Sequence, residues 1–401
     1  MNVLLVQPPN HYHGKNREQV FFPTGMGYIA RAIIDEGHEV EVLDVHESQI
    51  SFEQITGIIR QKSFDIVGIS AMSTHYNYVR RLAEAVKKVS SDTLIILGWV
   101  LSTHSYHVVL ENTEVDICVI GEGEITIKEL LRSFGNYDAI DGIAFKKDGR
   151  IVKNNDRKYV KNLDTLPWPA YHLFPMEEYI TNLNVIGSDK AVRTMNVPTG
   201  RGCPYNCNFC SKSFSGTRVR SISDVIKEIQ YLKDNYQIEG VIFADECLVT
   251  RRSRVLELCD RIRELELNWH CQGRVNLVDE EVLLSMKSAG CKAIGYGFES
   301  GSQKILDAMN KKATISQAKK AIFETERAGL YPIFQMMFGY PGEDKETIRE
   351  TIDFFKDIGH PGCDFSPTTP LPGTELWRYS LERGLIRNEK DFLEKLEGGY
   401  S

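Results

Sequence analysis

Apolar positions in the first third of the chain follow two periods in alternation. Short, continuous apolar runs predict buried strands at residues 3–6, 39–45, 65–70, 93–98 and 116–124. Between most of them apolar residues recur every three or four positions, which predicts helices at residues 24–36, 51–62 and 76–90. Only the last two strands are expected to be joined by a short connection. Strands that alternate with helices are typical of βαβ units, so this region is predicted to form a doubly wound parallel sheet.

The same alternation returns in the second half of the chain. Strand-like runs separated by helical patterns lie at residues 191–200, 240–246, 269–276, 293–300, 332–340 and 363–370. These are six βα repeats, fewer than the eight that close a barrel. The predicted fold class is therefore α/β, with an N-terminal doubly wound, Rossmann-like domain followed by a partial (β/α)6 barrel.

The region between these two series follows neither pattern. Asp148-Gly149 is typical of a hairpin turn, and the prolines and aromatic residues of 166–175 predict an extended connector. The end of the chain is short and helical in character. We therefore expect a first domain, a linker, a barrel domain and a C-terminal tail at residues 1–140, 141–190, 191–375 and 376–401.

The overall charge gives little sign of a polyanionic partner. The net charge is −7 with histidine neutral, which leaves no basic footprint for nucleic acid and no polybasic patch for a membrane surface. The first residues lack the basic start and long apolar run of a signal peptide, and no apolar stretch reaches the length of about 18 residues that spans a bilayer. We expect a cytoplasmic protein with no nucleic-acid partner and no membrane span.

Three of the nine cysteines lie together in CPYNCNFC, at Cys203, Cys207 and Cys210. A [4Fe-4S] cluster normally takes four cysteines, so three on one loop leave one iron open to another molecule. A structural zinc site would want a fourth ligand, which His270 or Cys271 could supply from a distant strand. The sequence therefore favours an iron–sulfur cluster whose ligands, and catalytic residues, are these three cysteines. The other six are expected to be mostly small buried side chains.

The C-x3-C-x2-C spacing, with aromatic Phe209 before the last cysteine, resembles the signature of the radical S-adenosylmethionine (radical SAM) superfamily. The resemblance covers roughly residues 190–375 and implies the same partial barrel. It implies that SAM binds the open iron, and that one electron from the cluster cleaves it to methionine and a 5′-deoxyadenosyl radical. An external donor such as flavodoxin or ferredoxin would supply that electron. Phe209 resembles the aromatic residue beside the adenine.

Residues at the ends of the predicted barrel strands resemble further SAM contacts of this superfamily. Asp245 and Glu246 match the acidic pair near the amine of SAM, where opposite charge is favourable. Arg274 matches a residue that faces the carboxylate, as a guanidinium fork suits. Glu299 matches the residue that bonds the ribose hydroxyls, and Gly339 begins a loop near the adenine. Each of them alone could equally be a salt bridge or a turn.

The first domain resembles the cobalamin-binding domain of one subfamily of radical SAM enzymes. The resemblance rests on QPP after the first strand, on PTGMGYIARAIIDEGHEVEVLD and on VDICVIGEGE. It implies that a corrin lies between the carboxyl edge of the sheet and the barrel. The strand-end residues expected to contact it are Ser70, Thr74, Gly98, Trp99, Gly121 and Glu122.

Two features depart from that pattern. The segment Asp44-Val45-His46 begins like the D-x-H-x-x-G motif that supplies a histidine to cobalt in some proteins, but Gln49 replaces the glycine and the segment follows the second strand, so we interpret it as a chance match. Trp99 stands where relatives often have a second glycine, and its indole could crowd a corrin or pack beside it. Three other histidines near strand ends could approach cobalt, although solvent-facing positions are the simpler expectation: His75, His104 and His107.

Together the two resemblances imply methyl transfer from methylcobalamin to an unactivated carbon, or a phosphinate phosphorus, of an unidentified small-molecule or peptide substrate. The alternative with the same fold is rearrangement, dehydration or cyclisation without methyl transfer. A tRNA methylthiotransferase would need more cysteines in its first half than Cys118, and an auxiliary-cluster peptide maturase more near its end than Cys363. A protein that only senses SAM or cobalamin would have no use for an open iron.

Overall fold

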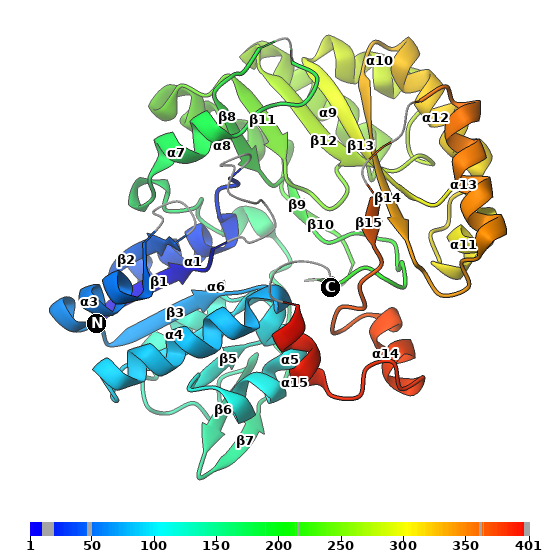
Figure 1. Ribbon diagram of the computed structural model, residues 1–401. Helices are drawn as coiled ribbons and strands as arrows, with labels where there is room; N and C mark the ends of the chain where they lie inside the picture. Colours follow the sequence, from blue (N-terminus) through cyan, green and yellow to red (C-terminus); the bar gives the residue numbers. More distant parts are fainter. Residues whose placement is uncertain are drawn as a thin grey trace.

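The computed structural model describes residues 1–9, 20–45, 50–188, 190–212, 214, 216–360, 363 and 365–396. These form two α/β bodies, each built on its own sheet, and Figure 1 shows the blue-to-cyan N-terminal body below the green-to-orange barrel. Within the described ranges, no helix is long and apolar enough to cross a membrane. The predicted fold class is confirmed.

The N-terminal sheet has the strand order β2-β1-β3-β4-β5-β6-β7. Its parallel strands are β1 (Asn2–Gln7), β2 (Glu39–Asp44), β3 (Ile66–Ser70), β4 (Leu94–Gly98) and β5 (Ile117–Val119). Its helices are α1 (Thr24–Asp35), α3 (Phe52–Lys62), the short η1 (Ser73–His75), α4 (Tyr76–Val89), α5 (Trp99–Asn112) and α6 (Glu124–Arg132). Because the strand order reverses between β1 and β3, a crevice is expected at the carboxyl ends of these two strands.

Helix α5 lies where the sequence predicts a short connection, and that expectation is wrong. The helix has 14 residues, and its buried face includes Ser102 and Ser105. The Ser102 hydroxyl donates to the Val119 carbonyl at 2.6 Å, and Ser105 donates to Glu389 at 2.7 Å. Since hydrogen-bonded serines replace apolar residues on the buried face, the helical period is hidden in the sequence.

The first sheet continues past residue 140. Strands β6 (Ile143–Lys147) and β7 (Arg150–Lys153) form an antiparallel hairpin, and β6 pairs with β5. The turn residues Asp148 and Gly149 both have positive φ, 50° and 72°, as the favoured two-residue hairpin turn requires. The hairpin expected at this position is confirmed.

The segment between the two sheets joins their apolar cores. It contains η2 (Leu163–Thr165), η3 (Tyr171–Leu173) and α7 (Met176–Asn182). The ring of Phe22, just before α1, lies with its centroid 5.1 Å from that of Tyr171 and 4.8 Å from that of Phe174. The Phe22 N–H also donates to the Asn196 side chain in the first barrel strand at 2.8 Å. One continuous core therefore runs from the first sheet into the barrel.

The barrel sheet is entirely parallel, in the order β15-β14-β13-β12-β11-β8. Its strands are β8 (Thr194–Val197), β11 (Gly240–Phe243), β12 (Asn268–Gly273), β13 (Cys291–Glu299), β14 (Tyr331–Phe338) and β15 (Phe365–Pro367). The helices outside it are α8 (Ile222–Tyr236), α9 (Arg252–Ile262), η4 (Arg263–Leu265), α10 (Glu280–Ser288), α11 (Gln303–Ala308), α12 (Ile315–Arg327) and α13 (Lys345–Asp357). The six predicted βα repeats are confirmed.

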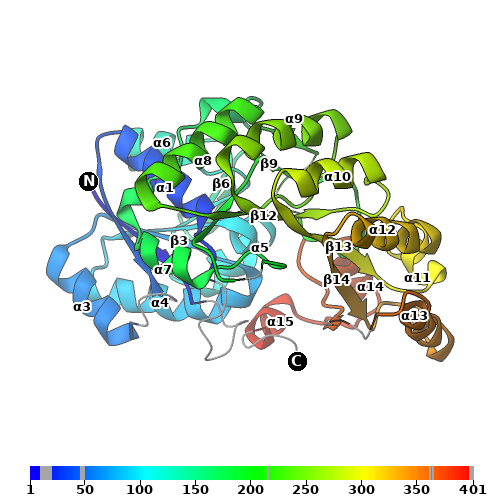
Figure 2. The same cartoon turned by 90° about the horizontal axis from the view of Figure 1, so that it is seen from above.

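The C-terminal tail returns to the first domain. Helix α14 (Glu375–Glu382) follows the barrel, and α15 (Glu389–Lys395) lies beside α5, as Figures 1 and 2 both show in red. Leu393 on α15 is fully buried in the core of the first domain. The Asn77 amide on α4 donates to the Glu394 carbonyl at 2.8 Å. The tail therefore connects the barrel to helices α4 and α5 of the first domain.

Replacing Leu393 by alanine is expected to lower the free energy of unfolding by about 2–4 kcal/mol, because a fully buried leucine loses its contacts and leaves a cavity. Urea unfolding of the metal-free chain measures the change. Leu385→Ala is the matched control, since this leucine is 70% exposed and its loss should change stability by less than about 0.5 kcal/mol. Equal effects of the two substitutions would show that α15 does not dock in solution.

Candidate active site

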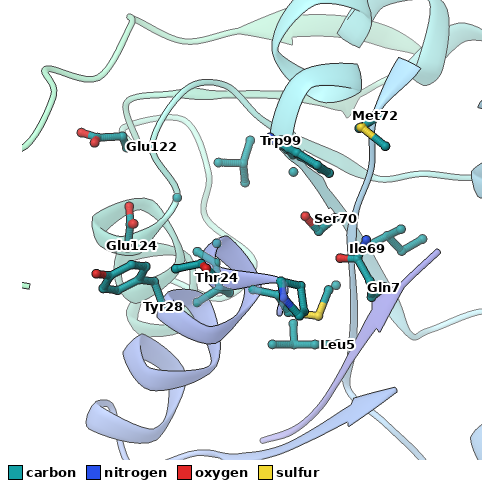
Figure 3. Close-up of a pocket in the computed structure, with 18 of the residues that line it drawn as sticks. Leu5, Gln7, Thr24, Tyr28, Ile69, Ser70, Met72, Trp99, Glu122 and Glu124 are labelled. Atoms are coloured by element: carbon teal, nitrogen blue, oxygen red, sulfur yellow. The ribbon is translucent and has the colours of Figure 1, made fainter. Parts of the chain in front are cut away.

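A cavity of about 490 Å³ lies between the two domains. Gln7, Ser70 and Gly98 line it from the ends of β1, β3 and β4, and Pro198 and Ala244 line it from just after β8 and β11. Figure 3 shows the N-terminal side of this cavity, with Gln7, Ser70, Met72 and Trp99 around it. Because both sheets present their carboxyl ends to the same space, a ligand bound there would contact both domains.

The lining on the side of the first domain is mainly apolar and leaves room at its backbone. Leu5, Met26 and Ile69 contribute side chains to the wall. Gly25, at the start of α1, also lines the cavity, and a Cβ added to it would meet no atom within 4 Å. An apolar wall with open space beside glycine, within the usual size of a ligand pocket, fits a broad, flat organic group.

Trp99 adopts a backbone conformation that is rare for a bulky residue. Its φ is +72°, in the left-handed region, 41% of its surface is exposed, and it lines the cavity. Such a conformation costs of order 1–2 kcal/mol for a residue with a Cβ, and it persists only where the surroundings hold it. The strain orients an indole into the space where a cofactor of the first domain would bind.

The other predicted contacts of the first domain divide into two sets. Ser70, Gly98, Gly121 and Glu122 line the cavity together with Trp99. Thr74 is buried in η1 and is not among the lining residues, although its neighbour His75 is.

The predicted histidines are placed in three different settings. The Nδ1 atom of His75 lies 3.2 Å from the Met72 N–H. His104 on α5 bonds the Lys212 carbonyl at 3.2 Å, and His107 pairs with Glu389 at 3.0 Å. His104 and His107 therefore connect α5 to the cysteine loop and to α15 and do not line the cavity. His46 and Gln49 lie outside the described residues.

Glu122 ties the first domain to the strands that flank the cysteines. Its carboxylate lies 2.6 Å from a guanidinium nitrogen of Arg201 in β9 (Gly200–Arg201) and 2.8 Å from one of Arg218 in β10 (Arg218–Val219). The Glu122 side chain is 2% exposed, and Glu124 pairs with Arg201 at 2.5 Å. A buried carboxylate remains charged only with such partners, so the pairs hold the two domains in one arrangement.

The three predicted cysteines lie on the loop between β9 and β10. The Lys212 ammonium donates to the Tyr205 carbonyl and to the Asn206 side chain, the latter at 2.7 Å, and so braces the loop from within. The Asn208 N–H donates to the Met309 carbonyl after α11 at 2.9 Å, and the Leu376 N–H donates to the Asn208 carbonyl at 2.9 Å. The loop is therefore fixed from both sides by the barrel and by the C-terminal tail.

The three thiols of this loop are candidates for the ligands of a cluster. Among the described residues, no three His, Cys, Asp or Glu side chains lie close enough together to hold one metal ion. A [4Fe-4S] cluster takes one thiolate at each iron, so three cysteines leave one iron open. Desolvation and the neighbouring thiolates of Cys207 and Cys203 raise the pKa of the Cys210 thiol to about 11. Bound iron would offset that repulsion, so the residues present fit a three-cysteine [4Fe-4S] site.

The six remaining cysteines lie outside this loop. Cys363 is half-buried. The other five are buried, as the sequence predicts for small apolar side chains: Cys118, Cys247, Cys259, Cys271 and Cys291.

The predicted acidic pair after β11 serves two different contacts. Asp245 accepts hydrogen bonds from the Thr199 N–H and hydroxyl, both at 2.9 Å, and thereby connects the ends of β11 and β8. Burial raises the pKa of Asp245 to about 6, and the Thr199 hydrogen bonds oppose the rise. Glu246 lines the cavity, and burial raises the pKa of its carboxyl too, against the charge of Lys212. Of this pair, Glu246 is thus the side chain that a ligand in the cavity would contact.

Arg274, Glu299 and Phe209, the last of which belongs to the cysteine loop itself, are not among the residues that line the large cavity. Glu299 ends β13 at a shift in register and has a positive φ of 71°. Its carboxylate lies 2.7 Å from the ammonium of Lys311, which lies 5.7 Å from the Phe209 ring centroid. Gly339, after β14, has a φ of +81° and lines a separate, shallower hollow with Tyr340.

Lys311 is a residue that no sequence pattern singles out. It lies between α11 and α12 beside Lys312, and two adjacent lysines in a loop are typical of a solvent-exposed turn. In the structure Lys311 is only 7% exposed, because the loop folds over the cysteine segment and pairs it with Glu299.

Comparisons with known proteins agree with this arrangement. Residues 197–355 match the radical SAM superfamily, and residues 13–131 match the B12 binding domain. The chain is 31% identical to an uncharacterised methyltransferase of Pyrococcus horikoshii, over 96% of this chain and 84% of the relative. It is 29% identical to the anaerobic magnesium-protoporphyrin IX monomethyl ester cyclase of Rubrivivax gelatinosus, over 94% of this chain and 70% of that relative.

Solved structures show the same fold at lower identity. The radical SAM methyltransferase TsrM from Kitasatospora setae, with cobalamin and a [4Fe-4S] cluster bound, has a TM-score of 0.77 at 18% identity, covering 95% of this chain and 75% of that chain. The cobalamin-dependent radical enzyme OxsB, with aqua-cobalamin and SAM bound, has a TM-score of 0.76 at 19% identity, covering 98% of this chain and 56% of that chain.

The parallel half-barrel with its cysteine loop, and the doubly wound domain that it faces, agree with these two family matches. This chain belongs to the radical SAM superfamily, in the group that carries a B12 binding domain before the barrel. The expected cofactor set of a [4Fe-4S] cluster, SAM and cobalamin is confirmed by the two domains.

The free energy of unfolding of Trp99→Gly is expected to be about 0.5–1 kcal/mol higher than that of Trp99→Ala. Both variants lose the indole, but only glycine relieves the strain of the positive φ. Urea unfolding of the two metal-free variants measures this difference. At Val100, the next residue of α5, the order should reverse, since an ordinary helical position favours alanine over glycine. Alanine being the more stable at both positions would show that Trp99 is not strained in solution.

Asp245 should make stability depend on pH in a defined direction. The pKa of Asp245 in the folded protein, about 6, is above the ordinary value of an aspartate. Asp245 therefore contributes its full share of the free energy of unfolding below about pH 4, and this share is lost as the pH rises through 6. Relative to Asp245→Asn, the native chain should therefore lose roughly 2–3 kcal/mol between pH 4 and pH 7, since each tenfold change in proton affinity corresponds to about 1.4 kcal/mol. Urea unfolding across this range tests it, and a constant difference between the two proteins would contradict it.

Proposed function

We propose that this enzyme transfers a methyl group to an unactivated carbon, or a phosphinate phosphorus, of its substrate. The observation that carries the proposal is the shared cavity, because Ser70 and Trp99 of the first domain and Glu246 of the barrel line the same space. A group bound against the first sheet would therefore lie in open connection with the barrel end that carries the cysteine loop. When bound, the corrin supplies the methyl group and SAM supplies the radical.

The residues of the chain have separate parts in this proposal. Cys203, Cys207 and Cys210 hold the cluster, and Glu246 provides a negative charge for the amine of SAM. Glu299 and Phe209 are suited to the ribose hydroxyls and the adenine of SAM. The remaining proposed contacts to SAM and to the corrin are Asp245, Arg274, Gly339, Ser70, Thr74, Gly98, Trp99, Gly121 and Glu122.

The chain's own contacts exclude water and keep the two halves in register. The pairs of Glu122 with Arg201 and Arg218 close one side of the seam between the domains, and the Phe22 aromatic group closes another. A closed site protects a reactive radical from side reactions. Residues 1–140, 141–190, 191–375 and 376–401 are the proposed first domain, linker, barrel domain and tail.

The relatives support methyl transfer and also define the alternative. One further relative is the cytidylyl-2-hydroxyethylphosphonate methyltransferase of Streptomyces wedmorensis, 25% identical over 97% of this chain. The Rubrivivax gelatinosus cyclase, at 29%, favours ring formation without methyl transfer as the second candidate. The proposed substrate is a small molecule or a peptide.

The partners and location follow from the chemistry. We propose an external one-electron donor, flavodoxin or ferredoxin, and no nucleic-acid partner, since the net charge is −7. Cytoplasmic location is proposed because a cysteine-held cluster and several free thiols suit a reducing compartment.

Anaerobic reconstitution followed by added hydroxocobalamin and desalting tests the cofactor set. We expect about four irons, four sulfides and one retained corrin per chain. A variant with Cys203, Cys207 and Cys210 all replaced by alanine should lose the iron and keep the corrin, because the two cofactors are held by different domains. In a separate step, the reconstituted native enzyme is reduced and given SAM with a deuterated methyl group. The deuterium label should then appear in the corrin fraction.

Two results would overturn the proposal in different ways. About four irons without a corrin would remove cobalamin from the reaction. A retained corrin that never takes up the label, while 5′-deoxyadenosine accumulates, would replace methyl transfer by cyclisation or rearrangement.

A further inference from the structure

Arg274 lies directly beside one of the cysteine sulfurs. It follows β12, which ends at Gly273, and is 8% exposed. Its Nη1 atom lies 3.7 Å from the Sγ atom of Cys207, within hydrogen-bonding range for sulfur. The sequence suggests that Arg274 faces the carboxylate of SAM, whereas this contact is with the cluster ligand itself.

The guanidinium is held so that one edge points to that sulfur. It lies over the ring of Tyr205, in the cysteine loop, with 3.6 Å from Cζ to the ring centroid. Its Nη2 atom donates to the Lys311 carbonyl, and its Nε atom lies 3.4 Å from the Asn276 side-chain oxygen. The Asn276 amide in turn donates to the Tyr205 hydroxyl at 3.1 Å. The contact to Cys207 is thus built by several neighbours and does not depend on a freely rotating side chain.

The positive charge of Arg274 is not neutralised locally. Among the described residues it makes no salt bridge, whereas the nearby Lys311 is paired with Glu299 at 2.7 Å. Lys212, the other cation of the loop, donates to loop carbonyls. Arg274 is therefore the cation whose charge and N–H both reach Cys207 without a carboxylate between them.

We propose that Arg274 tunes the cluster, raising its reduction potential through the N–H contact to Cys207 and through its buried charge. Reduction adds one electron to the cluster, and a fixed positive charge in a low-dielectric site stabilises the more negative, reduced form. Hydrogen bonds to cluster sulfurs and the net charge around them are recognised determinants of such potentials. The result is a cluster that accepts an electron from the external donor more readily. This inference rests on the cluster site and not on methyl transfer.

The test is a redox titration of the reconstituted enzyme, followed by electron paramagnetic resonance, without SAM, cobalamin or substrate. Arg274→Gln should lower the ratio of reduced to oxidised cluster at least tenfold at a fixed potential, which is about 59 mV for a one-electron couple. Arg274→Lys keeps the charge but loses the planar guanidinium and its stacking on the ring. Its midpoint potential should therefore lie between those of the native enzyme and Arg274→Gln. The control is Arg252→Gln, which removes the charge of an arginine 47% exposed at the side chain and paired with Asp279; its midpoint should equal that of the native enzyme.

A second measurement separates this role from a contact to SAM. The affinity for SAM is taken from the change that SAM causes in the cluster spectrum. Weaker SAM binding by Arg274→Gln with an unchanged midpoint would overturn the proposal and leave Arg274 as a SAM contact. If Arg274→Gln does not retain its irons, Arg274→Lys decides, and a midpoint equal to that of the native enzyme would overturn the proposal. Failure of methyl transfer would leave this measurement unaffected.

Discussion

The parallel strands of the two sheets face each other here at their carboxyl ends, and the buried contact of Glu122 with Arg201 and Arg218 holds them in that relation. Glu122 comes from the loop after β5, and the two arginines flank the cysteine loop on β9 and β10. A carboxylate with 2% of its side chain exposed would be strongly unfavourable alone, so the contact tolerates little sliding of one domain over the other. Glu122, Arg201 and Phe22 all line the cavity, so the contacts that join the two domains also form its wall.

The polar chemistry of the molecule lies at the strand ends because the central strands are buried on both faces. Residues such as Val3, Leu5 and Val6 in β1 are almost inaccessible, as in parallel sheets covered by helices. Side chains with functional groups can therefore reach a ligand only from the loops that follow the strands. Two of these positions, Trp99 and Glu299, have positive φ without being glycine, and both residues are proposed cofactor contacts.

Around the cysteine loop, the positive charges have different partners. Lys212 braces the loop carbonyls, Lys311 pairs with Glu299, and Arg274 stacks on Tyr205 and contacts the Cys207 sulfur. Since the cluster changes charge by one electron, the residue that faces its sulfur without a counter-ion affects the electron transfer most directly. The same loop thus combines ligands, mechanical support and an electrostatic neighbour.

The sequence by itself determined the two α/β series, the six βα repeats and the cysteine triad, because periodicity and ligand spacing are local properties of the chain. It also indicated which strand ends carry functional groups. It missed α5, whose buried serines hide the helical period, and it missed Lys311, which looks like half of an exposed lysine pair. Only the tertiary structure decided that Asp245 bonds Thr199 while Glu246 reaches the cavity, and that Arg274 lies against Cys207. These choices depend on contacts between segments far apart in the chain, and no local pattern records such contacts.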